Sequence, residues 1–234
     1  MKKSEKYNEI SFSSVFSENI FNYLNEDQKN IMLSYSEKRV YSKYSILYDE
    51  GAKPLGVFLI KTGIVKIYKT NKHTGKEHII RFAKSGDIIG FRSVISNETF
   101  CTSAKAIEET VVLVIPSSIF YDFIKENHDF SMQLISLSCK ELGESNKFIT
   151  DLALKNLRER IAEILILFYN NFGLDENNYI KITLNREDIA NIVGTATESL
   201  IRQLSDLKKE GIIDLKGKRI KILDLKKLQK ISSI

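Results

Sequence analysis

The sequence predicts an α+β protein with an N-terminal antiparallel β-roll, one long helix and a C-terminal winged helix-turn-helix. Three observations predict it. Short β-rich runs separated by glycines fill residues 43–116, and a proline-free helical stretch follows over 117–172. Two helical segments separated by a glycine turn, and then an alternating hairpin, occupy residues 183–222. The predicted parts are residues 1–126 (the roll with an N-terminal helix), 127–155 (the long helix) and 156–234 (the winged helix-turn-helix).

The composition predicts a folded cytoplasmic protein. The chain has 234 residues, and 43% of them are hydrophobic, which is enough to build real cores. No run approaches the roughly 18 apolar residues that span a bilayer, and the first ten residues lack the apolar segment of a signal peptide. Cys101 and Cys139 are not grouped like metal or cluster ligands, so we interpret them as small buried residues.

The first part has the strand-and-turn rhythm of an antiparallel roll or barrel. Val57–Ile60 and Ile64–Tyr68 alternate as strands do, and His73–Lys76 between two such runs predicts a hairpin loop. Apolar residues at the N-terminus predict a helix that packs on the roll. They are Phe12, Val15, Phe16, Ile20, Phe21 and Leu24.

The helical stretch after Pro116 predicts two or three helices, and one of them carries a regular stripe. The stripe residues are separated alternately by three and four positions, as in an a/d seam between paired helices. Periodicity alone leaves open whether the stripe meets a second helix or packs against the roll. The stripe consists of Ile135, Ser138, Leu142, Ser145, Ile149 and Leu152.

The C-terminal part predicts a helix-turn-helix. A polar turn over Gly173–Asn178 precedes it. Asn185 is a good N-cap with Asp188 three residues on, and Gly194 supplies the tight turn before a second helix that we expect to start at Thr195. The inward stripe of that second helix is Leu200, Leu204 and Leu207.

The outer face of the second helix has side chains that can read bases. Arginine can bond guanine, and glutamate can accept from cytosine.

Residues 181–234 hold 12 Lys/Arg against 7 Asp/Glu, whereas residues 1–180 hold 23 of each, so the whole excess of +5 lies in this part. Gly211–Ile222 alternates as a hairpin with a basic tip, which predicts a wing. A simpler interpretation makes Glu198 and Arg202 an ordinary i,i+4 surface pair. The expected base-reading residues are Thr197, Glu198, Ile201 and Arg202, and the expected phosphate contacts are Arg186, Thr195, Lys216, Lys218 and Arg219.

Three passages resemble the Crp/Fnr family of bacterial transcription regulators. Residues 47–63 with Gly86–Gly90 resemble its cyclic-nucleotide-binding jelly roll, Leu157–Ala162 resembles the end of its dimerisation helix, and 192–202 resembles its helix-turn-helix. The resemblance implies a homodimer on a palindromic double-stranded DNA site with TGA-like half-site cores, and RNA polymerase as a candidate partner. Thr197 replaces an arginine of the cAMP-binding members. The implied dimer seam is Ile135, Ser138, Leu142, Ile149 and Leu152.

The effector site departs from the pattern of the cAMP-binding members, which carry Gly-Glu-Leu after the glycine turn and an Arg-Ser pair further on. This chain has Gly90–Arg92 and Cys101–Ala104 instead, so both charged ligands are missing and a buried phosphate would be poorly compensated. We therefore predict an effector other than cAMP, with Arg92 as a candidate anion ligand. The expected pocket residues are Gly90, Phe91, Arg92, Cys101, Thr102, Ser103, Ser145 and Asn146.

Cofactors and other functions are constrained by the cysteines and histidines. Residues 1–50 contain no cysteine, which excludes the N-terminal iron-sulfur cluster of some relatives. Haem stays an alternative, with His73, His78, His128 and Cys101 as candidate ligands. No His-x-His pair supports a cupin-like metalloenzyme, so we expect no catalytic metal and no enzyme activity. A constitutive DNA binder with an empty pocket is the alternative to an effector-switched regulator.

Overall fold

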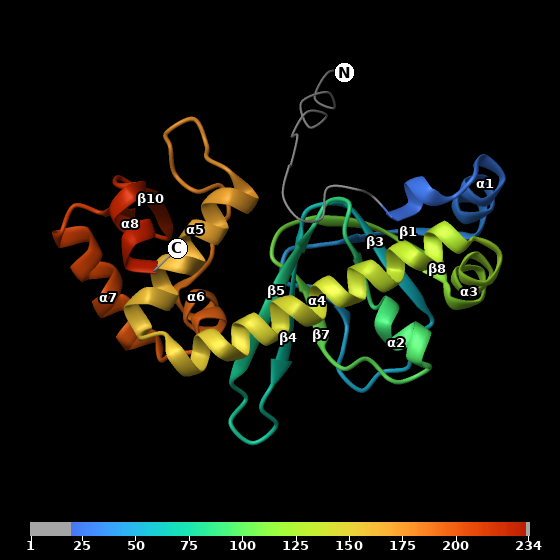
Figure 1. Cartoon of the computed structure of the whole chain (residues 1–234), viewed down its shortest axis with the longest axis horizontal. Coiled ribbons are helices and arrows are strands. Elements are labelled where there is room, and N and C mark those ends of the chain that lie inside the picture. Colours follow the sequence, from blue (N-terminus) through green and yellow to red (C-terminus); the bar gives the residue numbers. More distant parts are fainter. Residues whose placement is uncertain (1–19, 233–234) are drawn as a thin grey trace.

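The structure, a computed structural model, describes residues 20–232, in which a β-roll and a helical head are joined by one long helix (Figure 1). Its strands are β1 (Glu37–Tyr41), β2 (Ile46–Tyr48), β3 (Gly56–Thr62), β4 (Ile64–Thr70), β5 (Glu77–Lys84), β6 (Ile88–Ile89), β7 (Ser103–Ala106), β8 (Thr110–Pro116), β9 (Ile213–Lys216) and β10 (Arg219–Ile222). The roll consists of two antiparallel four-stranded sheets, in the orders β1-β8-β3-β6 and β2-β7-β4-β5. The antiparallel roll and the C-terminal hairpin that the sequence predicts are therefore present.

Helices flank the roll and build the head. They are η1 (Ile20–Tyr23), α1 (Glu26–Tyr35), α2 (Phe91–Ser96), α3 (Ser117–Glu126), α4 (His128–Leu154), α5 (Leu157–Phe172), α6 (Arg186–Val193), α7 (Thr197–Lys209) and α8 (Leu225–Ser232). Three of them, α3 to α5, fill the predicted helical stretch. Within residues 20–232, no helix combines the length and apolar character that a membrane crossing requires.

Strand β3 is apolar on both faces because both faces are covered. Phe58 and Ile60 point into the core between the two sheets, whereas Val57 and Leu59 belong to a second core beneath the helices. That second core receives Ile20, Phe21 and Leu24, which agrees with the predicted N-terminal packing, although a short 3-10 helix forms there. The other predicted members, Phe12, Val15 and Phe16, lie outside the described residues.

The loop between β4 and β5 forms the predicted hairpin. Its connection is ordered by Asn71, whose side-chain oxygen accepts hydrogen bonds from the backbone N–H groups of His73 and Thr74. In Figure 1 this hairpin extends away from the roll beside the lower end of the head.

Helix α4 runs from the α1–α3 end of the roll to the head (Figure 1). Asn127 caps its first turn, accepting from the N–H of Phe130. Phe130, Leu134 and Glu141 are its buried residues, so this face meets the roll. Lys155 ends the helix.

Helix α5 begins immediately after a sharp break in the chain. Asn156 forms a reciprocal capping box with Glu159, which fixes the new helix start. The two sides of the break are tied by ion pairs, because Lys155 bridges Asp151 of α4 (3.1 Å) and Glu163 of α5 (2.7 Å). The break therefore has a defined geometry. The caps Asn127 and Asn156 lie at the boundaries that we predict between the parts of the chain.

The head is docked on the roll through an apolar contact. Tyr68, Ile79 and Ile107 of the roll share one core with the buried residues of α5 to α8. Phe82 of β5 adds edge-on ring contacts with Phe168 of α5, at 6.0 Å between centroids.

A buried ion-pair network adds a polar contact between roll and head. The Nζ of Lys66, on β4, lies 2.9 Å from Oδ1 of Asp188 on α6 and also pairs with Glu77, which Lys105 approaches at 3.2 Å. Burial alone would lower the pKa of Lys66, but the hydrogen bonds to Glu77 and Asp188 raise it, so the amine stays charged. Beside this network His78 Nδ1 lies 2.9 Å from the carbonyl oxygen of Asn191.

We predict that Lys66→Met lowers the free energy of unfolding by about 3 kcal/mol, because it leaves the buried carboxylate of Asp188 without a counter-charge. Lys69→Met is the matched control, since Lys69 lies on the same strand and its pair with Glu50 is exposed. Urea denaturation measures both variants. Equal, small losses in the two would contradict the structural role of Lys66.

Candidate nucleic-acid interface and effector pocket

Helices α6 and α7 form the predicted helix-turn-helix. Asn185 caps α6 by accepting from the N–H of Asp188, and Gly194 ends it with φ +75°, a value that favours glycine. Helix α7 starts at Thr197, two residues later than predicted, because Thr195 and Ala196 complete the turn.

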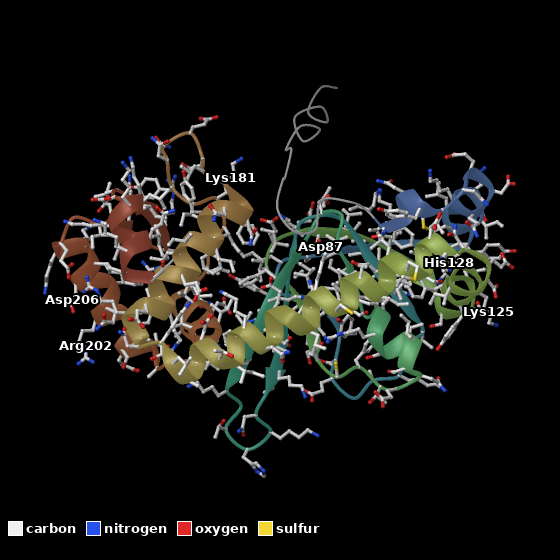
Figure 2. All side chains as sticks on the ribbon, viewed as in Figure 1. Asp87, Lys125, His128, Lys181, Arg202 and Asp206 are labelled. Atoms are coloured by element: carbon white, nitrogen blue, oxygen red, sulfur yellow. The ribbon has the colours of Figure 1, made fainter. Side chains whose placement is uncertain are left out.

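The outer face of α7 carries the predicted base-reading residues. Glu198, Ile201 and Arg202 are exposed, and Thr197 is half-buried, while Leu200, Leu204 and Leu207 are buried in the head as predicted. None of the ion pairs in the described part of the chain joins Glu198 to Arg202, so the interpretation as an i,i+4 pair is wrong for this structure. Figure 2 shows Arg202 at the outer surface of the head.

The predicted wing is the hairpin β9–β10, which turns at Gly217 and Lys218. Lys216 and Lys218 are exposed there. Arg219 differs from the expectation: it pairs with Asp175, and its guanidinium carbon lies 4.3 Å from the ring centroid of Tyr179. The two paired side chains are 35% and 30% exposed, so a phosphate would compete with Asp175 for Arg219, and the phosphate contact stays a prediction.

Arg186 also has a structural role. Its guanidinium donates to the carbonyl oxygens of Gly217 (2.9 Å) and Lys218 (3.4 Å) at the tip of the wing. Arg186 and the wing therefore lie on one side of the head, and the half-buried Thr195 lies in the turn before α7.

The far end of α4 lies against the turn of the helix-turn-helix. A Cβ placed on Gly194 would come within 3.0 Å of Cδ2 of Leu152. Leu152 therefore contacts its own head, whereas Ile135, Leu142 and Ile149 are 55%, 62% and 65% exposed. These three do not pack against the roll, which removes one of the two alternatives for the stripe. Ser138 is half-buried, and its hydroxyl donates to the carbonyl of Leu134.

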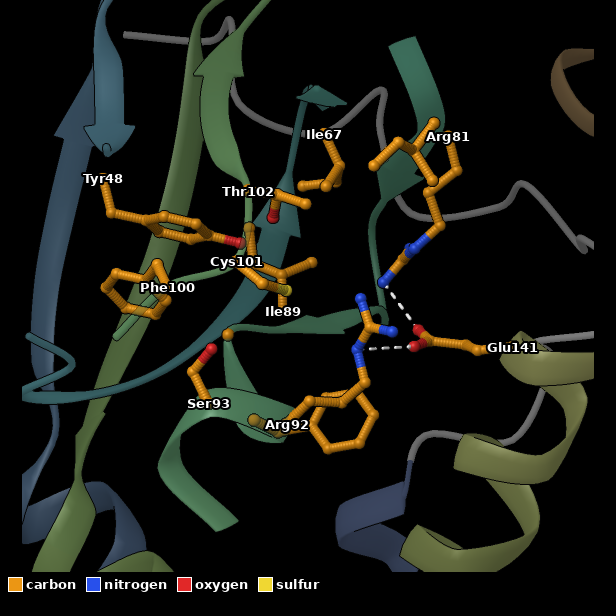
Figure 3. A pocket seen from close by; sticks show the side chains of 13 residues that line it. Tyr48, Ile67, Arg81, Ile89, Arg92, Ser93, Phe100, Cys101, Thr102 and Glu141 are labelled. Carbon is orange, nitrogen blue, oxygen red and sulfur yellow. Dashed lines mark hydrogen bonds and ion pairs between the residues drawn. The ribbon is translucent and has the colours of Figure 1, made fainter. Parts of the chain in front are cut away.

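A small pocket lies between the roll and α4 (Figure 3). Its volume is about 30 Å³, which corresponds to one or two water molecules. Five of the predicted pocket residues line it, namely Gly90, Phe91, Arg92, Cys101 and Thr102.

Three of the predicted pocket residues do not line this cavity, and the prediction that the two cysteines are buried was wrong. Ser103 is buried and accepts from the N–H of Glu50, so it serves the strand. Ser145 lies one helical turn beyond Glu141, and Asn146 is a further 100° around the helix, so both are exposed outside the pocket. Both cysteines, Cys101 and Cys139, are exposed rather than buried.

The other residues that line the pocket were not predicted from the sequence, and three of them are ionisable: Tyr48, Arg81 and Glu141. Arg81 Nη2 lies 2.8 Å from Oε1 of Glu141, and Arg92 Nε lies 3.3 Å from Oε2 (Figure 3). Glu141 follows Leu134 by seven residues on the buried face of α4, and a carboxylate at that spacing was the available signal.

Tyr48 fills the other side of the pocket. Its ring stacks on Phe100 with centroids 3.9 Å apart, and burial raises the pKa of its hydroxyl to about 12. Gly90 has φ +81°, and a Cβ there would approach Phe100 to 3.0 Å, so glycine is required beside this ring. The neutral phenol and the two rings make this wall largely apolar.

Neither the pocket nor the histidines assemble a metal site. Across residues 20–232, no group of three or more His, Cys, Asp or Glu side chains is placed to hold a metal ion. His73 lies in the β4–β5 loop, His78 in β5 and His128 at the start of α4.

A β-roll joined by a long helix to a winged helix-turn-helix is an arrangement typical of DNA-binding transcription regulators. Residues 38–127 match the cyclic nucleotide-binding domain family, and residues 159–231 match the Crp-like helix-turn-helix domain family.

Known relatives agree with this class. The electron transport regulator A of Shewanella oneidensis is 30% identical over 191 residues, covering 80% of this chain and 75% of the relative. Among solved structures, a CooA mutant from Carboxydothermus hydrogenoformans is 28% identical with a TM-score of 0.71, covering 92% of this chain and 94% of that one. FixK2 from Bradyrhizobium japonicum, at 24% identity, shares the fold with a TM-score of 0.76 over 85% of this chain and 98% of its own.

The chain therefore belongs to the Crp/Fnr family of transcription regulators. The family consists of transcription regulators and not of enzymes, so the cupin-like alternative is set aside.

We predict that Gly194→Ala lowers the free energy of unfolding by about 2 kcal/mol. The loss has two causes: the added Cβ strains the left-handed backbone, and it approaches the side chain of Leu152 closely. Gly75→Ala is the control, because Gly75 has a similar φ of +67° and open space around it, and it should cost only about 1 kcal/mol. Urea denaturation of both, and of Gly194→Ala combined with Leu152→Ala, separates strain from contact. If Gly194→Ala and Gly75→Ala lower the free energy of unfolding equally, Leu152 does not constrain the turn.

Proposed function

We propose that the protein binds a palindromic DNA site as a homodimer, reads TGA-like half-site cores through α7, and responds to an effector other than cAMP. The exposed, unpaired Glu198 and Arg202 beside a basic wing are the observation that carries this proposal. Because Glu198 and Arg202 are exposed and do not pair with each other, both side chains are available to contact bases.

The division of roles follows from the geometry of the head. Arg202 is assigned to guanine and Glu198 to cytosine, with Thr197 and Ile201 at the edge of the reading face. Lys216 and Lys218 on the wing, together with Thr195 and Arg186 beside it, are assigned to the phosphates, which position the head without reading sequence.

The second copy of the chain is assigned to the outer face of α4. Ile135, Leu142 and Ile149 are exposed at intervals of seven residues, so they form one straight apolar line along the helix. The hydroxyl of Ser138 is bonded within the helix, which leaves that position compatible with a close helix pair. Two such lines in parallel would place the two heads on successive half-sites of a palindrome.

The pocket supports an effector smaller than a cyclic nucleotide. Its volume of about 30 Å³ does not accommodate a nucleotide in this conformation. Constitutive DNA binding is the second candidate, and one observation favours it: both arginines of the pocket are already paired with the carboxylate of Glu141. Effector-free DNA selection distinguishes the two.

We predict that Arg202→Ala weakens binding to the selected palindrome by about 10- to 100-fold per head and relaxes the preference at one base position, because a bidentate guanine contact is lost. Selection from random duplexes with the purified, ligand-free protein gives the palindrome, and titrations at several salt concentrations give affinities. Lys216→Ala is the matched control, expected to weaken all sequences alike and to lower the salt slope by about 1. Equal weakening of specific and random DNA by Arg202→Ala would contradict base reading.

We predict that Leu142→Glu converts the dimer to a monomer, because it places a charge in the apolar line of each α4. Light scattering after size-exclusion chromatography measures the mass. Leu154→Glu is the control, since Leu154 is 80% exposed on the same helix but lies off the line, and this variant should stay dimeric. A dimeric Leu142→Glu, or a monomeric parent protein at micromolar concentration, would refute the assignment.

A further inference from the structure

The pocket between the roll and α4 holds an unusual arrangement of charges. Two guanidiniums from different elements, Arg81 on β5 and Arg92 on α2, converge on the single carboxylate of Glu141 (Figure 3). Each carboxylate oxygen has its own arginine, at 2.8 Å and 3.3 Å. Arg81 donates a hydrogen bond to its oxygen, and Arg92 makes an ion pair with the other, so a carboxylate in this position is contacted by positive charge at both oxygens.

The carboxylate of Glu141 is the most buried of the three groups. Its side chain is 6% exposed, compared with 25% for Arg81 and 49% for Arg92. A buried carboxylate is stable only when it is paired, and each arginine keeps one of its sides toward solvent. The two arginines are thus accessible to an outside anion, while Glu141 depends on them.

Other charges near the pocket do not take the place of Glu141. Asp87 is close enough to Arg81 to feel its charge, but its carboxylate accepts from the backbone N–H of Lys84, and burial raises its pKa. Tyr48 faces the arginines as a neutral phenol, since its pKa is raised to about 12. Glu141 is therefore the carboxylate that contacts both guanidiniums, and the three groups together keep one net positive charge.

We propose that Arg81 and Arg92 form a site for a small carboxylate ligand, that Glu141 is its internal occupant, and that an external carboxylate competes with Glu141 for the two arginines. The proposal rests on the proposed function insofar as the roll is the sensory domain, and it names the chemical class of the effector. The cavity of about 30 Å³ is small, so the ligand's carboxylate would have to take the place of the Glu141 carboxylate.

Competition at this site would be transmitted through α4. Glu141 precedes Leu142 of the apolar line, and Leu152 at the end of the same helix lies against the turn before α7. A ligand that replaces Glu141 detaches this part of α4 from the roll. If the ligand and DNA favour different positions of α4, each lowers the affinity for the other, and if they favour the same position, each raises it. This reciprocity follows from thermodynamic linkage.

The test uses full-length Glu141→Ala and acetate as the probe. The variant leaves both arginines without their carboxylate, so acetate should bind it at least tenfold more tightly than it binds the parent protein. Calorimetric titration at constant ionic strength, with chloride as the exchanged anion, measures the affinities. Inorganic phosphate should bind less tightly than acetate, because the site is arranged for two oxygens of one planar group.

Controls separate the site from general charge effects. Glu144→Ala removes an exposed carboxylate from the same helix and should behave like the parent protein. Adding Arg81→Met to Glu141→Ala should abolish the gained affinity. If Glu141→Ala does not fold, Glu141→Gln keeps the shape, removes the competing charge and should show a smaller gain in the same direction.

Two results would overturn the proposal: no gain in acetate affinity in either Glu141 variant, or a gain that survives the loss of Arg81. Tighter binding of phosphate than of acetate would overturn the carboxylate class. These titrations contain no DNA, so their failure is distinguishable from a failure of the proposed DNA binding, which the selection experiment measures separately.

Discussion

The packing of α4 against the roll is the contact on which both ends of the molecule depend. Phe130 and Leu134 anchor the helix in the apolar core, and Glu141 continues the same face as a charged contact. The helix has 27 residues and is therefore about 40 Å long. The same helix therefore carries Glu141, which contacts the roll, and Leu152, which lies beside the turn of the helix-turn-helix.

The position of the head is determined by two further contacts of different character. The apolar contact of Phe82 with α5 is tolerant of small shifts, whereas the pair between Lys66 and Asp188 requires close approach of two charged atoms. Asp188 also stands at the N-terminus of α6, where a negative charge is favourable. One carboxylate thus stabilises the first helix of the reading unit and ties that unit to the roll.

Local sequence patterns predicted the helices, strands and turns well. Contacts between elements that are distant in the sequence were not predicted. Asn185, Gly194 and the leucines of α7 are governed by caps, turns and periodicity, which are visible within a dozen residues. The contacts of Arg219 with Asp175 and Tyr179 were not predicted, because these partners lie in an earlier loop that no periodic pattern connects to the wing. Arg81 and Glu141 were missed for the same reason, since 60 positions separate them along the chain.

The hydrogen bonds from Arg186 to the tip of the wing affect the thermodynamics of recognition. Hairpin tips ordinarily sample several backbone conformations, and ordering them at a binding surface costs entropy. Here the carbonyls of Gly217 and Lys218 are already held by a side chain from the neighbouring helix. The order of the tip is therefore part of the folding free energy of the head, and a partner that binds the tip would not have to supply the entropy of ordering it.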